Sequence, residues 1–374
     1  MSNNDNDNES ARASRRSFLK TAMASGALLG TASIVGCGDG DSTAVTLPPA
    51  TKNRVCEILG IEKPVISAPM MNLTDAEFVA AVSNAGGLGV LAAVVGAAEL
   101  NDPQMGEKLA AEIRKITTLT NKPFGVTYPN SASDRAAFHE LVLEVKPAAV
   151  LPPPDPVMLA ELRAAGIKII AGVATWFNPA NDNLDGYLAE LDATQADIML
   201  VKCYGCGGTI PQNRANLIAK MQMLAGHIPV PLVPGGGITN AAGAKAAAAA
   251  GAEGVWVGTR FLATHESPAH PNCKQVILET KACDIVEFRG SFPSWVNANP
   301  SPKALLARSL DRAGASDDEM RAVGNAEAIL RGMRLGDMDN WYAAINPSVD
   351  TITELKSCKE VVDELGDAVL AAQA

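Results

Sequence analysis

Two glycine runs stand directly after two short apolar stretches of the chain. Residues 230–233 are followed by Gly235-Gly236-Gly237, and residues 254–257 are followed by Gly258-Thr259. Glycine lets backbone N–H groups approach an anion closely, and the dipole of a following helix favours negative charge at the same place. The pattern therefore predicts a phosphate cradle. Tight strand–helix turns that hold no ligand are the alternative.

A second group able to do chemistry is the pair Cys203 and Cys206, spaced as C-x-x-C. In an exported protein such a pair can form a structural or redox-active disulfide. A metal site would need two more ligands, and no second pair stands at matching spacing. Two buried thiols that only fill space are the remaining alternative. Besides Cys37, the chain has an even set of cysteines, which permits pairing: Cys56, Cys203, Cys206, Cys273, Cys283 and Cys358.

The stretches that would position these residues alternate between strand and helix patterns. The β-rich runs are residues 64–69, 88–94, 123–128, 148–151, 168–174, 197–201, 230–233 and 254–257. Helix patterns follow at residues 75–85, 103–119, 134–145, 156–165, 184–191, 214–224 and 240–250, with 272–280 as the eighth. Eight such units close most simply into an α/β fold, the (β/α)8 TIM barrel, whose loops after strands seven and eight are the usual phosphate site. An open doubly wound sheet is the alternative.

The pattern changes after residue 282. Helix patterns lie at residues 303–314, 317–334, 340–344 and 358–371. They predict a helical extension over residues 283–374, packed on a barrel over residues 53–282. This tail either covers the mouth of the barrel or forms a contact between two copies in a homodimer.

Composition excludes two kinds of partner. The net charge of −10 leaves no basic face for nucleic acid. In the body of the chain no apolar run reaches the roughly 18 residues that a membrane span needs. Hydrophobic residues make up 47 % and aromatic residues only 4 %, so the core should consist mostly of Ala, Val, Ile and Leu. We expect the partner to be a small-molecule substrate.

The N-terminus is expected to be an export signal rather than part of the fold. Arg15-Arg16 is followed by Phe18-Leu19-Lys20 and by a mildly apolar run over residues 21–36. This arrangement resembles a twin-arginine signal. That route carries proteins already folded, which implies a cofactor loaded before export.

The apolar run ends in Ile34-Val35-Gly36-Cys37, which resembles a lipobox. Cys37 is therefore the predicted lipidation site, and an ordinary cleavage site is the alternative. Residues 1–37 would be the signal and residues 38–52 a flexible tether. The mature protein would be periplasmic or held at the membrane only through the lipid on Cys37.

Several short motifs stand within the predicted barrel. They are Leu59-Gly60-Ile61, Ala68-Pro69-Met70, Ser83-Asn84-Ala85-Gly86-Gly87-Leu88-Gly89, Pro123-Phe124-Gly125-Val126, Gly236-Gly237-Ile238 and Gly258-Thr259-Arg260-Phe261-Leu262-Ala263-Thr264. Together they resemble the flavin-dependent nitronate monooxygenases, once called 2-nitropropane dioxygenases, whose close relatives are FMN-dependent enoyl reductases. The likeness covers roughly residues 56–278.

The resemblance implies an FMN-binding barrel. The glycines after strands seven and eight, with the Thr259 hydroxyl, would hold the phosphate, and residues 69–71 would lie along the flavin ring. Thr127 stands where relatives usually carry asparagine. The residues that the resemblance assigns to the cofactor are Pro69, Met70, Met71, Thr127, Lys202, Gly207, Gly208, Gly236, Gly237, Gly258 and Thr259.

The sixth loop departs from the family's usual Gln-Gly-x-Glu-Ala-Gly-Gly-His. The catalytic histidine of the family becomes Thr209 here. Threonine cannot take a proton near neutral pH, which excludes proton abstraction from a nitroalkane by this residue. Lys202 takes the place of the glutamine, where a cation can stabilise negative charge on the flavin; a local ion pair is the alternative. His265, after strand eight, is a candidate replacement base.

The expected activity is that of an FMN-dependent oxidoreductase. It would oxidise a nitronate, or a similar activated carbanion that needs no base, with O2 as the acceptor. One alternative is an exported flavin reductase that draws electrons from a quinone or from the Cys203/Cys206 thiols. The other is a ligand-binding lipoprotein that has lost catalysis. We expect no metal site.

Overall fold

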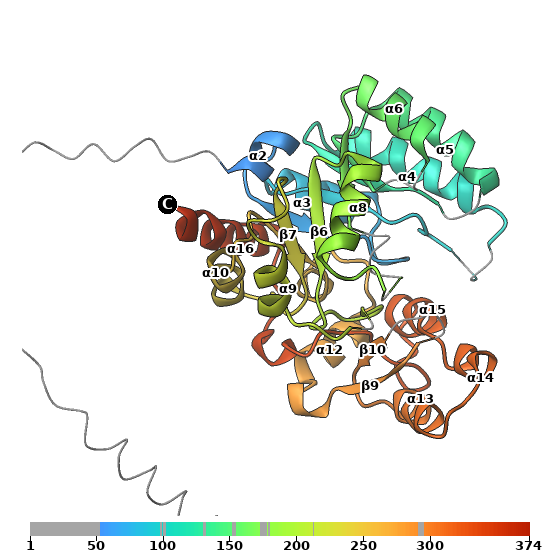
Figure 1. Cartoon of the computed structure of the whole chain (residues 1–374). Helices are drawn as coiled ribbons and strands as arrows, with labels where there is room; N and C mark the ends of the chain where they lie inside the picture. Colours follow the sequence, from blue (N-terminus) through green and yellow to red (C-terminus); the bar gives the residue numbers. More distant parts are fainter. Residues whose placement is uncertain are drawn as a thin grey trace, which may run out of the picture. The chain divides into compact units, whose positions relative to one another are not determined.

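A computed structural model describes residues 53–97, 99, 102–129, 132–151, 155–172, 178, 180–211, 213–290 and 295–374 (Figure 1). The predicted export signal and tether, with Cys37, lie outside the described residues. Among the helices of the described part, none is long and apolar enough to span a membrane.

Eight parallel strands form the centre of the fold. They are β1 (Val65–Ser67), β2 (Gly89–Leu91), β3 (Phe124–Thr127), β4 (Ala149–Leu151), β5 (Lys168–Ala171), β6 (Ile198–Lys202), β7 (Leu232–Gly235) and β8 (Val255–Val257), paired in the order β1-β8-β7-β6-β5-β4-β3-β2. The two edges of the sheet meet, because the Ser67 amide donates to the Leu88 carbonyl at 2.9 Å and Ile66 forms a bridge with Leu88. The sheet is thus a nearly closed barrel, which confirms the (β/α)8 prediction over the open sheet.

Helices follow the strands and surround the barrel (Figure 1). They are α3 (Ala76–Asn84), α4 (Met105–Leu119), α5 (Ala132–Val145), α6 (Pro156–Ala164), α8 (Leu184–Thr194), α9 (Leu217–Leu224) and α10 (Ala241–Ala249). Helix α2 (Arg54–Leu59) instead precedes β1, and its Val55 and Leu59 pack in a second apolar cluster with strand residues such as Ile66 and Val90. Side chains cap several of their N-termini. The Asp75 carboxylate accepts from the Phe78 backbone amide at 3.0 Å, and the side-chain oxygen Oδ1 of Asn240 accepts from the Gly243 backbone amide at 3.0 Å.

The register of the last strands brings three loops to one place. Lys202 at the end of β6 pairs with Gly235 at the end of β7, and Gly235 pairs with Trp256 of β8. A Cβ on Gly235 would lie 2.6 Å from the indole ring of Trp256. Glycine is therefore required there, since the indole lies across the end of β7.

The tail beyond the barrel strands contains short helices and one hairpin. Its elements are α11 (Thr259–Leu262), α12 (Pro271–Glu279), η1 (Ala282–Asp284), β9 (Val286–Arg289), β10 (Trp295–Ala298), α13 (Pro302–Arg312), α14 (Asp317–Ala322), α15 (Asn325–Glu327), the π-helix η2 (Ala328–Arg334), η3 (Val349–Thr351) and α16 (Cys358–Gln373). Strands β9 and β10 pair antiparallel. Most of these elements share an apolar cluster of their own.

The last helix, α16, belongs to the barrel rather than to that tail cluster. Its buried Val362 and Leu365 join the core shared by the barrel strands and their helices, and α16 lies beside α10 (Figure 1). Helix α12 instead contributes Cys273 and Ile277 to the tail cluster. The prediction that residues 272–280 form the eighth barrel helix is therefore wrong, because the chain inserts the tail before the helix that completes the ring.

Two further expectations for the tail differ from the structure. Residues 340–344 form a turn and extended backbone instead of a helix, and Ala344 forms an antiparallel bridge with Ala298 of β10. The hairpin β9–β10 was not expected within a helical extension. Its strands are only four residues long, which leaves little alternating pattern in the sequence.

Candidate active site

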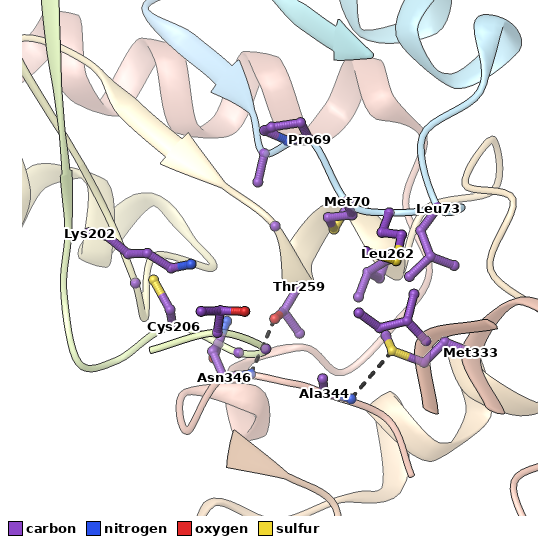
Figure 2. Close-up of a pocket in the computed structure, with 18 of the residues that line it drawn as sticks. Pro69, Met70, Leu73, Lys202, Cys206, Thr259, Leu262, Met333, Ala344 and Asn346 are labelled. Atoms are coloured by element: carbon purple, nitrogen blue, oxygen red, sulfur yellow. Dashed lines mark hydrogen bonds between the residues drawn. The ribbon is translucent and has the colours of Figure 1, made fainter. Parts of the chain in front are cut away.

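A cavity of about 300 Å³ opens at the carboxyl ends of β1, β6, β7 and β8, and the tail covers it (Figure 2). Its lining from the barrel and its loops is Ala68, Pro69, Met70, Met71, Leu73, Lys202, Cys206, Gly207, Gly208, Thr209, Gly236, Gly237, Ile238, Trp256, Gly258, Thr259 and Leu262. The tail adds Gly290, Ala326, Ile329, Met333, Ala344 and Asn346. The tail thus covers the barrel mouth, which is one of the two roles that the sequence leads us to expect for it.

Most of the predicted site residues meet in this cavity. The structure brings together Pro69, Met70, Met71, Lys202, Cys206, Gly207, Gly208, Thr209, Gly236, Gly237, Gly258 and Thr259. Thr127, Cys203 and His265 are not among the lining residues. Thr127 lies at the end of β3, where its buried hydroxyl has no hydrogen-bond partner among the described residues. His265 is exposed, so the structure does not bring the candidate replacement base to the cavity.

The glycines at the end of β7 allow loop six, residues 203–211, to approach the barrel closely. Gly236 and Gly237 have φ values of 125° and 77°, which glycine tolerates and other residues rarely adopt. A Cβ on Gly236 would lie 3.0 Å from both the Cys203 carbonyl oxygen and the Cys206 amide nitrogen. The predicted cradle is therefore free of side chains because the backbone leaves no room for them.

Loop six is bound to the tail as well as to β7. The side-chain amide of the buried Asn297 donates to the backbone carbonyl of Cys206 at 3.0 Å. Ile210 exchanges two backbone hydrogen bonds with Trp295, at 2.8 and 3.1 Å. A Cβ on Gly207 would lie 2.7 Å from the backbone of Ile345. The tail therefore fixes the position of the loop that carries Cys206 and Thr209.

Thr259 connects the loop after β8 to the tail. Its hydroxyl oxygen accepts from the Asn346 amide at 3.2 Å (Figure 2). The hydroxyl proton is not used by that bond, so it can be donated to an anion in the cavity. The four-residue helix α11 begins at Thr259.

Lys202 supplies positive charge to the cavity. It is the last residue of β6, and its ammonium lies 5.8 Å from the centre of the Trp256 ring. Burial lowers the pKa of Lys202 below that of free lysine; nearby Cys206 opposes this effect and Lys220 adds to it. In Figure 2 the Lys202 nitrogen and the Cys206 sulfur lie at one end of the cavity, away from Met70, Leu73, Leu262 and Met333.

Both cysteines of loop six are free thiols. The Cys203 thiol donates to the Val201 carbonyl at 3.5 Å, whereas the Cys206 thiol donates to the Gly235 carbonyl at 3.3 Å. Burial raises the pKa of each thiol. The two thiols are therefore separate in the structure, and of the two only Cys206 lines the cavity. The described residues contain no group of ligands able to hold a metal ion.

Sequence reasoning missed the part of the lining that comes from distant segments. Trp256 lies inside β8, and in the sequence it is only one residue of an apolar run. Asn346 stands before Pro347, and this dipeptide is typical of a turn. It is the one local feature of the sequence that marks Asn346. Ile329 and Met333 lie on a π-helix, a feature frequent at functional sites, and no local pattern places that helix over the barrel.

A (β/α)8 barrel with a glycine-lined cavity at the carboxyl ends of its strands is a class of protein that binds small molecules at that face. A family model described as nitronate monooxygenase matches residues 52–142 and 140–367. The chain therefore belongs to the nitronate monooxygenase family.

Curated relatives match at moderate identity. The (3aS,4S,5R,7aS)-5-hydroxy-7a-methyl-1-oxo-octahydro-1H-indene-4-carboxyl-CoA dehydrogenase of Mycobacterium tuberculosis is 31 % identical over 231 residues, 61 % of this chain and 60 % of that protein. A nitronate monooxygenase of Pseudomonas aeruginosa is 29 % identical over 280 residues, 62 % of this chain and 74 % of the relative. The chain thus spans about 60 % of the length of the first of these relatives.

Solved structures support the fold. FabK from Thermotoga maritima superposes with a TM-score of 0.71 at 23 % identity, over 85 % of this chain and 96 % of that one. Nitroalkane oxidase from Streptomyces ansochromogenes superposes with a TM-score of 0.65 at 22 % identity, over 85 % of this chain and 98 % of that one. At these identities the likeness concerns the fold alone.

Proposed function

We propose that this enzyme binds FMN in the cavity and oxidises a nitronate, or a similarly activated carbanion, with O2 as the acceptor. One observation carries the proposal: a single cavity joins both glycine loops, Met70 and Lys202 in a chain of the nitronate monooxygenase family. The relatives named nitronate monooxygenases support the substrate class.

The residues present suit FMN. Gly236 and Gly237 present backbone without Cβ atoms, and the Thr259 hydroxyl retains a proton to donate, so a phosphate has donors at this end. Met70, Leu262 and Met333 offer an apolar surface to a flat ring at the other end. The cavity therefore combines an anion cradle with an apolar slot, as a flavin mononucleotide requires.

When bound, FMN supplies a two-electron acceptor that O2 can reoxidise. Lys202 places a cation in the cavity, where it stabilises negative charge on a bound anion. The Thr209 hydroxyl lines the same space and can donate to an oxygen of the substrate. Tail residues, among them Met333 and Asn346, line the same space.

The residue at position 209 favours a nitronate as the substrate. A histidine at the corresponding position of the family can take a proton from a neutral nitroalkane, whereas Thr209 cannot near neutral pH. A nitronate is already an anion, so its oxidation needs no proton acceptor at position 209. The sequence of loop six by itself favours the same substrate class, a nitronate.

Oxygen uptake by the purified holoenzyme tests the proposal. We expect one FMN per chain by absorbance, and O2 consumption when propionate 3-nitronate is added. A chain that retains no flavin after reconstitution would contradict the cofactor assignment. A flavin-loaded protein that ignores nitronates, but is reduced by a quinol or a dithiol, would instead support the flavin reductase.

A further inference from the structure

Three consecutive residues of the tail, Asn346-Pro347-Ser348, lie against both glycine loops; we call them the tail turn. The Asn346 backbone amide donates to the Thr259 hydroxyl at 3.2 Å, in the loop after β8. A Cβ on Gly237 would lie 3.0 Å from the Ser348 hydroxyl oxygen, so Ser348 packs directly on the loop after β7. The tail turn therefore forms a third side of the cavity, next to the two loops.

Hydrogen bonds hold the tail turn in one conformation. The side-chain oxygen Oδ1 of Asn346 accepts from the Ser348 backbone amide at 2.8 Å, and the Thr351 hydroxyl donates to the Ser348 carbonyl at 2.8 Å. The same Thr351 hydroxyl is hydrogen-bonded to Thr239, which follows the glycines after β7. Pro347 has a fixed φ, which stiffens the turn further. The polar groups of the turn are thus in place before any ligand binds.

The Asn346 side chain offers two N–H groups to the cavity. Asn346 lines the cavity, and only 4 % of its surface is exposed. A backbone N–H can only donate, so the atom that faces Ser348 must be the oxygen, and the Nδ2 group is turned away from Ser348. Within the described part of the chain, no residue accepts a hydrogen bond from Nδ2. In Figure 2 Asn346 lies beside Thr259 and away from Met70 and Leu73.

Helix α10 does not supply the donors that its position after β7 suggests. The Ala241 backbone amide donates to the Glu364 carboxylate at 3.0 Å, and the Gly243 backbone amide donates to Oδ1 of Asn240 at 3.0 Å. Two amides of the first turn are thus already used, which limits what this helix can offer to an anion in the cavity. Further donors have to come from the loops and from the tail turn.

We infer that the tail turn is the third arm of the phosphate site, and that Nδ2 of Asn346 donates to the phosphate group of FMN. The other arms are the Gly236-Gly237 backbone and the Thr259 hydroxyl, which keeps its proton. None of the described lining residues is acidic, so no carboxylate opposes an anion here. This inference rests on the proposed function, because FMN is the ligand that brings the phosphate.

A comparison of FMN with riboflavin tests the assignment, because riboflavin has the same ring and no phosphate. The apoprotein of the whole chain is titrated with each flavin, and flavin fluorescence gives the two Kd values. Asn346→Asp keeps an oxygen for the Ser348 amide but replaces both donor hydrogens by a second carboxylate oxygen. The Kd for FMN should rise at least about tenfold, because a charge-assisted hydrogen bond is lost and a negative charge is added. The Kd for riboflavin should change less than about threefold.

Asn183→Asp is the matched control. Oδ1 of Asn183 also accepts from a backbone amide, that of Gly186 at 3.0 Å, but Asn183 is exposed and does not line the cavity. The same change of side chain should leave both Kd values as in the wild type. Thermal unfolding of the two variants separates an effect on binding from a loss of the fold.

Inorganic phosphate gives a second readout that needs no flavin. A ligand that binds only the folded protein raises its stability, so phosphate should raise the midpoint of thermal unfolding of the wild-type apoprotein. The rise should be smaller in Asn346→Asp and unchanged in Asn183→Asp. Chloride at the same ionic strength controls for a general effect of salt.

The outcomes separate this inference from the proposed function. Equal weakening of FMN and riboflavin in Asn346→Asp would place the side chain at the flavin ring and overturn the inference. Unchanged FMN affinity in a folded Asn346→Asp protein would overturn it as well, and so would an equal effect of phosphate on all three proteins. A wild-type chain that binds FMN through Asn346 but oxidises no nitronate would support the tail turn and contradict the proposed oxidation.

Discussion

At the residue scale, the chemistry of the cavity depends on substitutions in loop six and on glycines that let the loop approach β7. Thr209 and Lys202 stand where a histidine and a glutamine are usual in the family, and both line the cavity. Gly236 has a φ of 125°, and a Cβ at this position would lie 3.0 Å from backbone atoms of Cys203 and Cys206. Single residues therefore decide the shape of the cavity and which polar groups line it.

Gly236→Ala tests the cradle. Its Cβ would lie 3.0 Å from two backbone atoms of loop six, so the loop must move away from the phosphate end. We expect FMN to bind at least about tenfold more weakly, measured by flavin fluorescence during titration of the apoprotein, which corresponds to about 1.4 kcal/mol.

Gly226→Ala is the matched control for that substitution. Gly226 has a φ of 80° and open space where a Cβ would stand. It should lose about 1–3 kcal/mol of stability through backbone strain and bind FMN like the wild type. Equal FMN affinity in Gly236→Ala and Gly226→Ala would contradict a role for Gly236 in the cradle.

At the element scale, the tail and the barrel build the site together. Loop six is tied to β10, and the segment around Asn346 is tied to Thr259. Neither contact could be predicted, because Asn297 is 91 residues from Cys206 and Asn346 is 87 residues from Thr259. The glycine loops could be predicted, since the strand, glycines and helix of each unit follow one another in the chain.

Asn297→Ala should loosen loop six. The substitution removes the 3.0 Å hydrogen bond to the Cys206 carbonyl in a partly buried place, at a cost of about 1 kcal/mol. We expect a lower midpoint of urea unfolding and weaker FMN binding. Asn340→Ala, at an exposed position of the tail, is the control; a similar loss of FMN affinity in both variants would rule out a specific tie through Asn297.

Leu365→Ala tests whether α16 completes the barrel. Leu365 is fully buried in the barrel core, so we expect a loss of about 2–5 kcal/mol in unfolding free energy. Leu335→Ala removes the same atoms from a side chain that is 61 % exposed and should change stability by less than about 0.5 kcal/mol. If the two variants unfolded at the same urea concentration, α16 would not be part of the core.

At the scale of the whole molecule, the sequence was enough to predict the barrel but not its last helix. Strands that are buried on both sides appear as short Val, Ile and Leu runs between helix patterns, as in β6 and β7. The eighth outer helix lies about 100 residues after β8, because the tail is inserted between them. Counting strand–helix units in order along the chain therefore assigns α12, and not α16, as the eighth outer helix.

Export remains a prediction from the sequence, and it concerns the chain as a whole. Replacing Arg15-Arg16 by two lysines should keep the protein in the cytoplasm, because the twin-arginine route reads the arginine pair. Cell fractionation with an antibody to the barrel would show the change. Cys37→Ala should leave export intact and move the protein from the membrane to the soluble periplasmic fraction; full export of the lysine variant would contradict the signal.

The central claim is that this barrel holds FMN and oxidises a nitronate. Anaerobic titration of the purified holoenzyme with propionate 3-nitronate tests it most directly. We predict that one equivalent of the nitronate bleaches the flavin absorbance and that admitting O2 restores it. A yellow protein whose absorbance stays unchanged under excess nitronate would contradict the account.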